Sequence, residues 1–304
     1  MQNNSAPSRT IAYVYAIAAA TLWGVGGPVA KYLFNHGVTA LALTQVRQTL
    51  SFLFLLTFFL ATRPALARIG LRDIPYLAVM GIGGLAMVQF SYYSAVSRIQ
   101  VAAAILLEYM ALIFILVYSA LFMKERITFP KAVSLLFAVA GCALVAGVYE
   151  VDFLKLNLTG VAWGLASAIF FSFYTLYGQA GLKKYNAMTL FAYASGFGAI
   201  LWWVLNPPQA FFAVKYSGLT WLAFVYLALF GTTLPFILYF ESLKRMEASR
   251  VSITTTLEPV VAGVVAYFFV GETLELLQII GGILVLAGIV LLQQTPSPPI
   301  PHVD

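Results

Sequence analysis

Residues 92–104 read YYSAVSRIQVAAA, and residues 239–251 read YFESLKRMEASRV. The two stretches belong to a longer correspondence, because equivalent residues recur at one constant separation of 147 positions. The pairs are Tyr92 with Tyr239, Arg98 with Arg245, Trp23 with Phe170, Glu125 with Glu272, and Gly141 with Gly288. A single offset that holds from the first hydrophobic run to the last predicts that the chain is a duplicated unit.

The composition indicates a lipid environment. Of 304 residues, 62% are hydrophobic and 9% are charged, whereas soluble domains have about 25% charged residues. The net charge of +6 does not indicate nucleic acid, because the basic residues occur singly or in pairs between apolar runs, which is typical of a membrane surface. We therefore predict an all-α integral membrane protein. Its expected partner is membrane lipid, and binding of nucleic acid is not expected.

The length of the apolar runs predicts ten membrane-spanning helices, since a helix needs about 20 apolar residues to cross the hydrocarbon core. The runs lie at about 11–34, 40–61, 74–96, 101–122, 131–149, 159–181, 188–205, 218–241, 250–270 and 275–293. We expect a short N-terminal segment (1–10), two five-helix repeats (11–149 and 159–293) and a disordered proline-rich tail (294–304).

The basic residues predict the orientation. With both termini on one side, the loops of that side hold twelve of them: Arg9, Arg63, Arg68, Arg72, Lys124, Arg126, Lys131, Lys183, Lys184, Lys244, Arg245 and Arg250. The opposite loops hold Lys31, Arg98, Lys155 and Lys215. Because cytoplasmic loops carry the excess of Lys and Arg, we expect both termini in the cytoplasm.

Each repeat has five spans. Because five is an odd number, the two repeats enter the membrane in opposite directions. Inverted repeats around an in-plane pseudo-twofold axis are typical of secondary transporters. Two similar halves can exchange conformations, so that a central site opens to one side and then to the other. Duplication for packing alone is the alternative.

Glycine and proline interrupt several spans. The run TLWGVGGPVAK (21–31) lacks the GK[ST] ending of a phosphate-binding loop. Small residues let neighbouring helices approach closely, and interrupted helices line cavities where freed backbone groups find partners. We expect helix bending at Gly27, Pro28, Gly83, Gly231, Pro235 and Pro259.

Two glutamates lie deep in the predicted spans. An ionisable group at the bilayer centre costs about 2.5–3.5 kcal/mol on insertion scales, so Glu108 and Glu258 are expected to face protein or water. At the constant offset Glu258 falls opposite Ala111, one turn from Glu108, which predicts nearly symmetric places. Either carboxylate could hold a substrate ammonium group or take up a proton. Alternatively, Glu258 ties down a backbone group freed by Pro259.

Polar and aromatic residues complete the predicted site. Arg47, within the second span, is interpreted as a structural group or as an anchor for a substrate carboxylate. An aromatic cavity with few polar groups suits an amphipathic solute. The predicted substrate-binding residues are Trp23, Gly24, Gln89, Tyr93, Glu108, Tyr109, Trp163, Tyr174, Tyr177 and Glu258.

The sequence resembles the EamA-type transporters of the drug/metabolite transporter superfamily. The resemblance covers about residues 11–293 and rests on Leu22–Trp23 before a glycine, Arg47 in the second span, LEPVVAGVVAYFFVGE (257–272) and the 5+5 repeat. It is greatest to the bacterial aromatic amino acid exporters. It implies a ten-helix carrier of the bacterial inner membrane that has a central cavity between its halves and exports amino acids or related metabolites.

The expected function is export of amino acids, aromatic or large neutral ones, by alternating access. No nucleophile–base pair, metal cluster or phosphate cradle is recognisable, so no enzyme, catalytic residue, metal site or cofactor is predicted. A multidrug or other metabolite exporter of the same superfamily, and a membrane receptor or scaffold that transports nothing, are the alternatives. A carrier of anionic sugar phosphates would need more basic residues within the spans than Arg47. Proton coupling and facilitated diffusion are equally compatible with the sequence.

Overall fold

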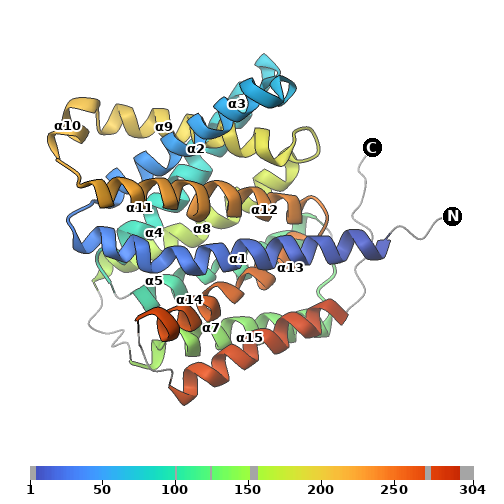
Figure 1. Ribbon diagram of the computed structural model, residues 1–304. Helices are drawn as coiled ribbons and strands as arrows, with labels where there is room; N and C mark the ends of the chain where they lie inside the picture. Colours follow the sequence, from blue (N-terminus) through green and yellow to red (C-terminus); the bar gives the residue numbers. More distant parts are fainter. Residues whose placement is uncertain (1–4, 100, 124, 151–156, 271–274, 295–304) are drawn as a thin grey trace.

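Helices form all the regular structure in the described part of the chain. The computed structural model describes residues 5–99, 101–123, 125–150, 157–270 and 275–294 (Figure 1). The first half contains α1 (Ser5–Asn35), α2 (Ala40–Thr62), η1 (Pro64–Ala67), η2 (Leu71–Asp73), α3 (Ile74–Val79), η3 (Met80–Ala86), α4 (Met87–Val96), α5 (Val101–Tyr109), α6 (Ala111–Phe122), α7 (Phe129–Val145) and η4 (Val148–Glu150). The second half contains α8 (Leu158–Gly181), α9 (Ala187–Leu205), α10 (Pro208–Ala213), α11 (Gly218–Ala228), η6 (Leu229–Thr233), α12 (Leu234–Leu243), α13 (Ala248–Thr255), α14 (Leu257–Val270) and α15 (Leu276–Gln294).

Local sequence explains where several helices begin. The side chains of Thr39, Asn157, Asn186 and Ser217 each accept a hydrogen bond from a backbone N–H in the first turn of α2, α8, α9 and α11. Such capping satisfies donors that have no partner inside the helix. These caps start the helices within one or two residues of the predicted starts.

The described residues include seven helical stretches that are long and apolar enough to cross a membrane. They are Ala40–Thr62, Leu71–Val96, Ala103–Phe122, Leu158–Gly181, Ala187–Leu205, Gly218–Leu243 and Leu276–Gln294. Helix α7 is apolar but shorter. Every predicted span coincides with one helix or with consecutive helical segments.

The ends of the chain differ from the predicted boundaries. Helix α1 already begins at Ser5, and α15 ends at Gln294. The early start has a structural reason, because Arg9 on α1 donates a hydrogen bond from Nη2 to the Gln293 carbonyl (2.7 Å). Of the predicted disordered tail (294–304), Gln294 is the last residue of α15, and residues 295–304 lie outside the described residues, as does Glu272.

Several spans are interrupted in the regions rich in glycine and proline. The segments η3 and η6 are π-helical and contain Gly83 and Gly231. Pro235 lies in the first turn of α12, directly after η6, and α14 begins two residues before Pro259. In contrast, α1 is helical through Gly27 and Pro28.

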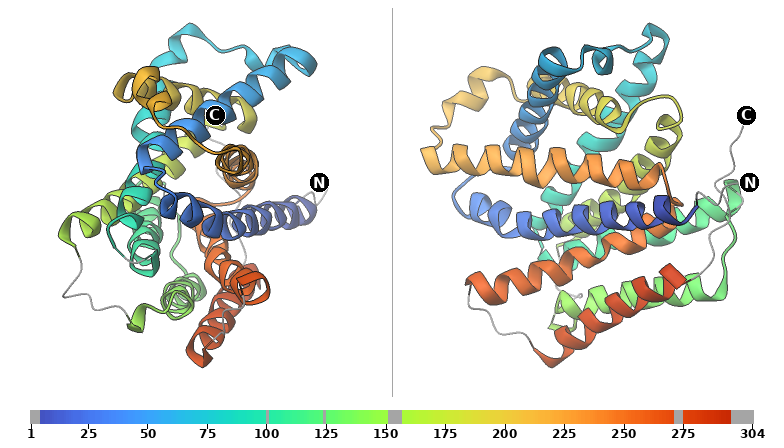
Figure 2. Two further views of the ribbon diagram at one scale, coloured as in Figure 1. Left: turned by 60° about the vertical axis from the view of Figure 1, so that its left-hand side comes forward. Right: turned by 45° about the vertical axis from the view of Figure 1, so that its right-hand side comes forward.

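The two halves intermesh rather than forming separate bundles. Helix α1 packs against α12 and α14, which come late in the chain, while α8 packs against α4 and α5, which come early (Figure 2). Helix α2 packs against α9, and α7 packs along α15. Residues of α1, α4, α5 and α14 are among those that line a central cavity.

Helices α7 and α15 approach closely at two glycines. A Cβ atom on Gly141 would lie 2.6 Å from the backbone oxygen of Gly281, and a Cβ atom on Gly281 would lie 2.6 Å from that of Gly141. The contacting atoms are backbone, so a side chain at either position would force the helices apart. Small residues at such crossings are typical of membrane helices.

We expect Gly141→Ala to lower the free energy of unfolding by about 1–3 kcal/mol, the usual effect of overpacking. Thermal unfolding of the purified protein in detergent measures it. The control is Gly282→Ala, because its Cβ atom would meet Val260 at an ordinary 3.6 Å and alanine favours the helix. Equal melting temperatures for the two variants would contradict the expectation.

Candidate functional site

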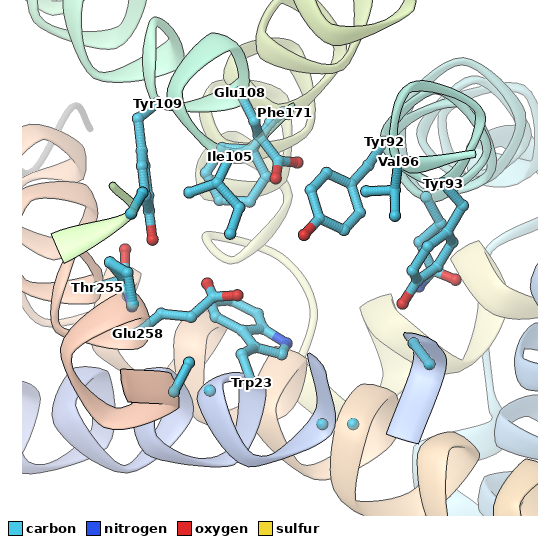
Figure 3. Close-up of a pocket in the computed structure, with 18 of the residues that line it drawn as sticks. Trp23, Tyr92, Tyr93, Val96, Ile105, Glu108, Tyr109, Phe171, Thr255 and Glu258 are labelled. Atoms are coloured by element: carbon cyan, nitrogen blue, oxygen red, sulfur yellow. The ribbon is translucent and has the colours of Figure 1, made fainter. Parts of the chain in front are cut away.

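A central cavity of about 760 Å³ lies between the two halves. Its walls come from α1, α2, α4 to α8 and α11 to α15, with η6 (Figure 3). Of the predicted substrate-binding residues, seven line it: Trp23, Gly24, Gln89, Tyr93, Glu108, Tyr109 and Glu258. The volume is in the range of small-molecule sites.

Glu108 and Glu258 approach the cavity from opposite walls. Glu108 lies near the end of α5 and Glu258 in the first turn of α14, and Figure 3 shows their carboxylates on either side of the central space. Among the described residues, no basic side chain forms an ion pair with either. The pair can therefore accept hydrogen bonds from a cationic group in the cavity.

Glycine in α1 brings the helix of Glu258 close to the cavity wall. A Cβ atom on Gly24 would lie 2.6 Å from the backbone oxygen of Glu258. The adjacent Trp23 contacts two aromatic residues of α12. Its ring centroid lies 5.0 Å from that of Phe236 and 5.6 Å from that of Tyr239. The Leu22–Trp23–Gly24 sequence thus combines a large aromatic wall with close helix packing.

Arg47 is buried at another part of the wall and has a single unused donor group. Its Nε donates to Thr232 Oγ1 (2.6 Å) and its Nη2 to the Gly231 carbonyl (2.7 Å). Its guanidinium carbon lies 5.1 Å from the ring centroid of Tyr93. Nη1 has no hydrogen-bond partner in the described chain. A structural role for Arg47 accounts for the hydrogen bonds of two of its three nitrogens, Nε and Nη2, and leaves Nη1 unexplained.

The π-helical segment η6 creates the partners of Arg47. A π-helix has an i→i+5 hydrogen-bonding pattern in place of the i→i+4 pattern of an α-helix. Thr232 and Thr233 donate from their hydroxyls to the carbonyls of Leu227 and Ala228, while Arg47 binds the Gly231 carbonyl. The irregular segment is in this way stabilised next to the cavity.

The cavity reaches one face of the molecule. Its lining includes Tyr32, Phe34 and the exposed Asn35 at the end of α1, Val96 at the end of α4, and Gln278 at the start of α15. These helix ends lie opposite the face where α1 begins and α15 ends, here called the terminal face (Figure 1). Towards the terminal face, Phe236, Tyr239 and Phe171 pack together beyond Trp23.

A buried ionic network lies at the terminal face. Lys131 of α7 forms ion pairs with Glu125 and with Glu247, whose Oε2 is 2.9 Å from Nζ. Glu247 also pairs with Arg250 of α13 (3.0 Å). The Arg250 guanidinium in turn donates to the Leu292 carbonyl of α15 (2.7 Å). The network joins segments of both halves, and none of its residues lines the cavity.

Three residues that were expected at the site lie elsewhere. Trp163 packs against Phe90 (5.3 Å between centroids), Tyr174 is fully buried against Phe236 and Phe240, and Tyr177 stacks on Tyr76. All three are on α8, whose aromatic residues occupy several faces of the helix. Only one of those faces, represented by Phe171, lines the cavity.

The sequence-based prediction missed polar residues on α13. Ser252 and Thr255 line the cavity beside Glu258. They lie three residues apart, on one face of a helix, within the run SITTTLEP (252–259). A polar run directly before an intramembrane glutamate was the signal that could have identified them. Tyr92, which projects between Glu108 and Tyr93 in Figure 3, is a further lining residue.

Comparison with known proteins identifies the class of this helical membrane protein. Two segments, residues 10–147 and 158–293, each match the EamA-like transporter family. An uncharacterized transporter of Archaeoglobus fulgidus is 30% identical over 268 residues, which cover 87% of this chain and 91% of that protein. The threonine/homoserine exporter RhtA of Escherichia coli is 25% identical over 88% of this chain and 85% of its own. A solved crystal structure with 20% identity has a TM-score of 0.77 and covers 93% of this chain and 96% of that one.

The chain belongs to the EamA-like transporter family. It is therefore a multi-pass membrane transporter of a small molecule and not an enzyme, which confirms these parts of the sequence analysis. The greater likeness to aromatic amino acid exporters stays a prediction.

Proposed function

We propose that the chain exports amino acids, mainly aromatic and other large neutral ones, by alternating access. The observation that carries the proposal is the cavity itself, in which two glutamates face one another between aromatic walls. The carboxylates attract an ammonium group, and the aromatic walls offer apolar surface to a side chain. That a relative is named a threonine/homoserine exporter supports amino acids as the substrate class.

We further propose ten spanning helices in two inverted five-helix repeats. The π-helical segments support this, because η6 (229–233) falls on residues 82–86 of η3 when 147 is subtracted. The crossing of α7 and α15 supports it as well. At that offset the contact of Gly141 with Gly281 corresponds to a contact of Gly288 with Ser134, where a Cβ on Gly288 would lie 3.0 Å from the Ser134 oxygen.

The terminal face is proposed to be cytoplasmic and the membrane to be the bacterial inner membrane. The excess of Lys and Arg in the loops of this face supports that orientation. The cavity then reaches the periplasmic side, and the ionic network lies on the cytoplasmic side. If the two pseudo-equivalent halves exchanged conformations, the cavity would open to the cytoplasm instead.

Uptake and counterflow in proteoliposomes test the proposal. We expect saturable transport of radiolabelled phenylalanine or leucine, and competition by other large neutral amino acids. Comparison with and without a pH gradient tests proton coupling. Transport or competition by cationic dyes but by no amino acid would instead indicate a multidrug exporter, and no flux of any solute would indicate a receptor or scaffold.

A further inference from the structure

We propose that Arg47 and Gln89 form a subsite for the carboxylate of the transported solute. The inference deepens the proposed function and rests on it for the class of solute. Both side chains line the cavity, each is 4% exposed, and both keep polar atoms without a partner in the described structure. The two residues come from different helices, α2 and α4, of the same half.

The guanidinium of Arg47 is held in place and still has a donor to offer. Thr232 and Gly231 bind two of its nitrogens, as described above, which leaves Nη1. A buried cation is unfavourable without a counter-charge, and no described carboxylate lies within ion-pair distance of Arg47. A fixed guanidinium next to a cavity therefore favours an anionic group, above all a planar carboxylate.

Gln89 brings a second donor to the same region. It precedes Tyr93 by four residues on α4, which places both on one face of the helix about one turn apart. The Tyr93 ring lies against the Arg47 guanidinium at 5.1 Å. Both the amide nitrogen and the amide oxygen of Gln89 are buried without a partner. Buried amides are normally hydrogen-bonded, so Gln89 is suited to bind a solute.

The subsite lies apart from the glutamates. Figure 3 shows Tyr92 between Glu108 and Tyr93, so a carboxylate held near Tyr93 is separated from the two carboxylates of the protein. The cavity thus has a cationic end and an anionic end. This polarity distinguishes carboxylate-bearing solutes from simple amines, which would satisfy only the glutamates.

Ligand-dependent thermal stabilisation of the purified protein tests the subsite. The probes are 3-phenylpropionate, which has a carboxylate and no ammonium group, 2-phenylethylamine, which has the reverse, and L-phenylalanine. We expect all three probes to stabilise the wild-type protein, 2-phenylethylamine through the glutamates alone. Gln89→Leu should weaken their apparent affinity about tenfold, because one hydrogen bond to a charged group is lost. Gln89→Glu should abolish the effect of 3-phenylpropionate by repulsion while leaving that of 2-phenylethylamine intact.

The control is Gln48→Leu, at a buried glutamine that does not line the cavity and bonds to Trp202. It should leave all three apparent affinities unchanged. Equal binding of 3-phenylpropionate by the wild type and both Gln89 variants would overturn the subsite, even if amino acids are transported. Gln89-dependent binding of 3-phenylpropionate without any amino acid transport would instead overturn the proposed function and retain the subsite.

Discussion

Glu258→Gln is expected to reduce amino acid transport by at least about tenfold. The charged carboxylate would bind a substrate ammonium group in a cavity shielded from bulk water, and such hydrogen bonds contribute about 1.5–3 kcal/mol. Glutamine has nearly the same shape, so the close packing of α14 against Gly24 should persist. Initial rates of uptake into proteoliposomes, over a range of substrate concentrations, measure the effect.

The same variant separates the two roles considered for Glu258. If the carboxylate binds the ammonium group, net uptake and substrate exchange both fall, and the apparent KM rises. If it carries a proton instead, exchange continues while uptake loses its dependence on the pH gradient. Glu108→Gln should show whichever of these two effects Glu258→Gln does not show, since the two residues face each other.

Glu150→Gln is the matched control, because Glu150 is exposed on η4 and does not line the cavity. Its transport should equal that of the wild type. Wild-type uptake and wild-type pH dependence in both Glu258→Gln and Glu108→Gln would contradict a role for the carboxylate pair in transport.

Depth in the predicted spans was a good guide to the cavity. Glu108 and Glu258 were selected because burying an ionisable group in lipid is unfavourable, and Gln89 because it shares a helix face with Tyr93. All three line the cavity. The length of the apolar runs likewise predicted helices at positions that the structure confirms. These predictions succeeded because they depend on two properties that can be read from the sequence, the charge of a residue and its position in an apolar run.

Residue type alone could not tell which face of an apolar helix borders the cavity. Phe171 and Tyr174 lie three residues apart on α8, yet only Phe171 lines the cavity, while Tyr174 packs against aromatic side chains of α12. Lys131 was counted only as a loop charge. Its burial depends on Glu247, 116 residues away, and no local pattern reports such a partner.

Lys131→Met is expected to lower the free energy of unfolding by about 3–5 kcal/mol, the usual effect of breaking a buried ion pair. Lys131 and Glu125 are 2% and 6% exposed, so the variant would leave buried carboxylates without their cation. The loss should be partly reversed in the double variant Glu125→Gln/Lys131→Met, because Glu247 keeps its ion pair with Arg250. Thermal unfolding measures both effects, and Lys183→Met, at an exposed loop position, is the control.

The network also bears on access to the cavity from the terminal face. At the offset of 147 residues, Lys131 corresponds to Gln278 and Arg250 to Ala103, so the opposite face lacks equivalent cations at these two positions. Weakening the network should therefore increase the population open at the terminal face, since a conformational equilibrium shifts when one state loses contacts.

Labelling of Ser252→Cys in a Cys142→Ser background, by an impermeant maleimide applied to the terminal face, measures this population. We expect faster labelling with Lys131→Met than with Lys183→Met, and equal rates would show that the network stabilises the fold without controlling access.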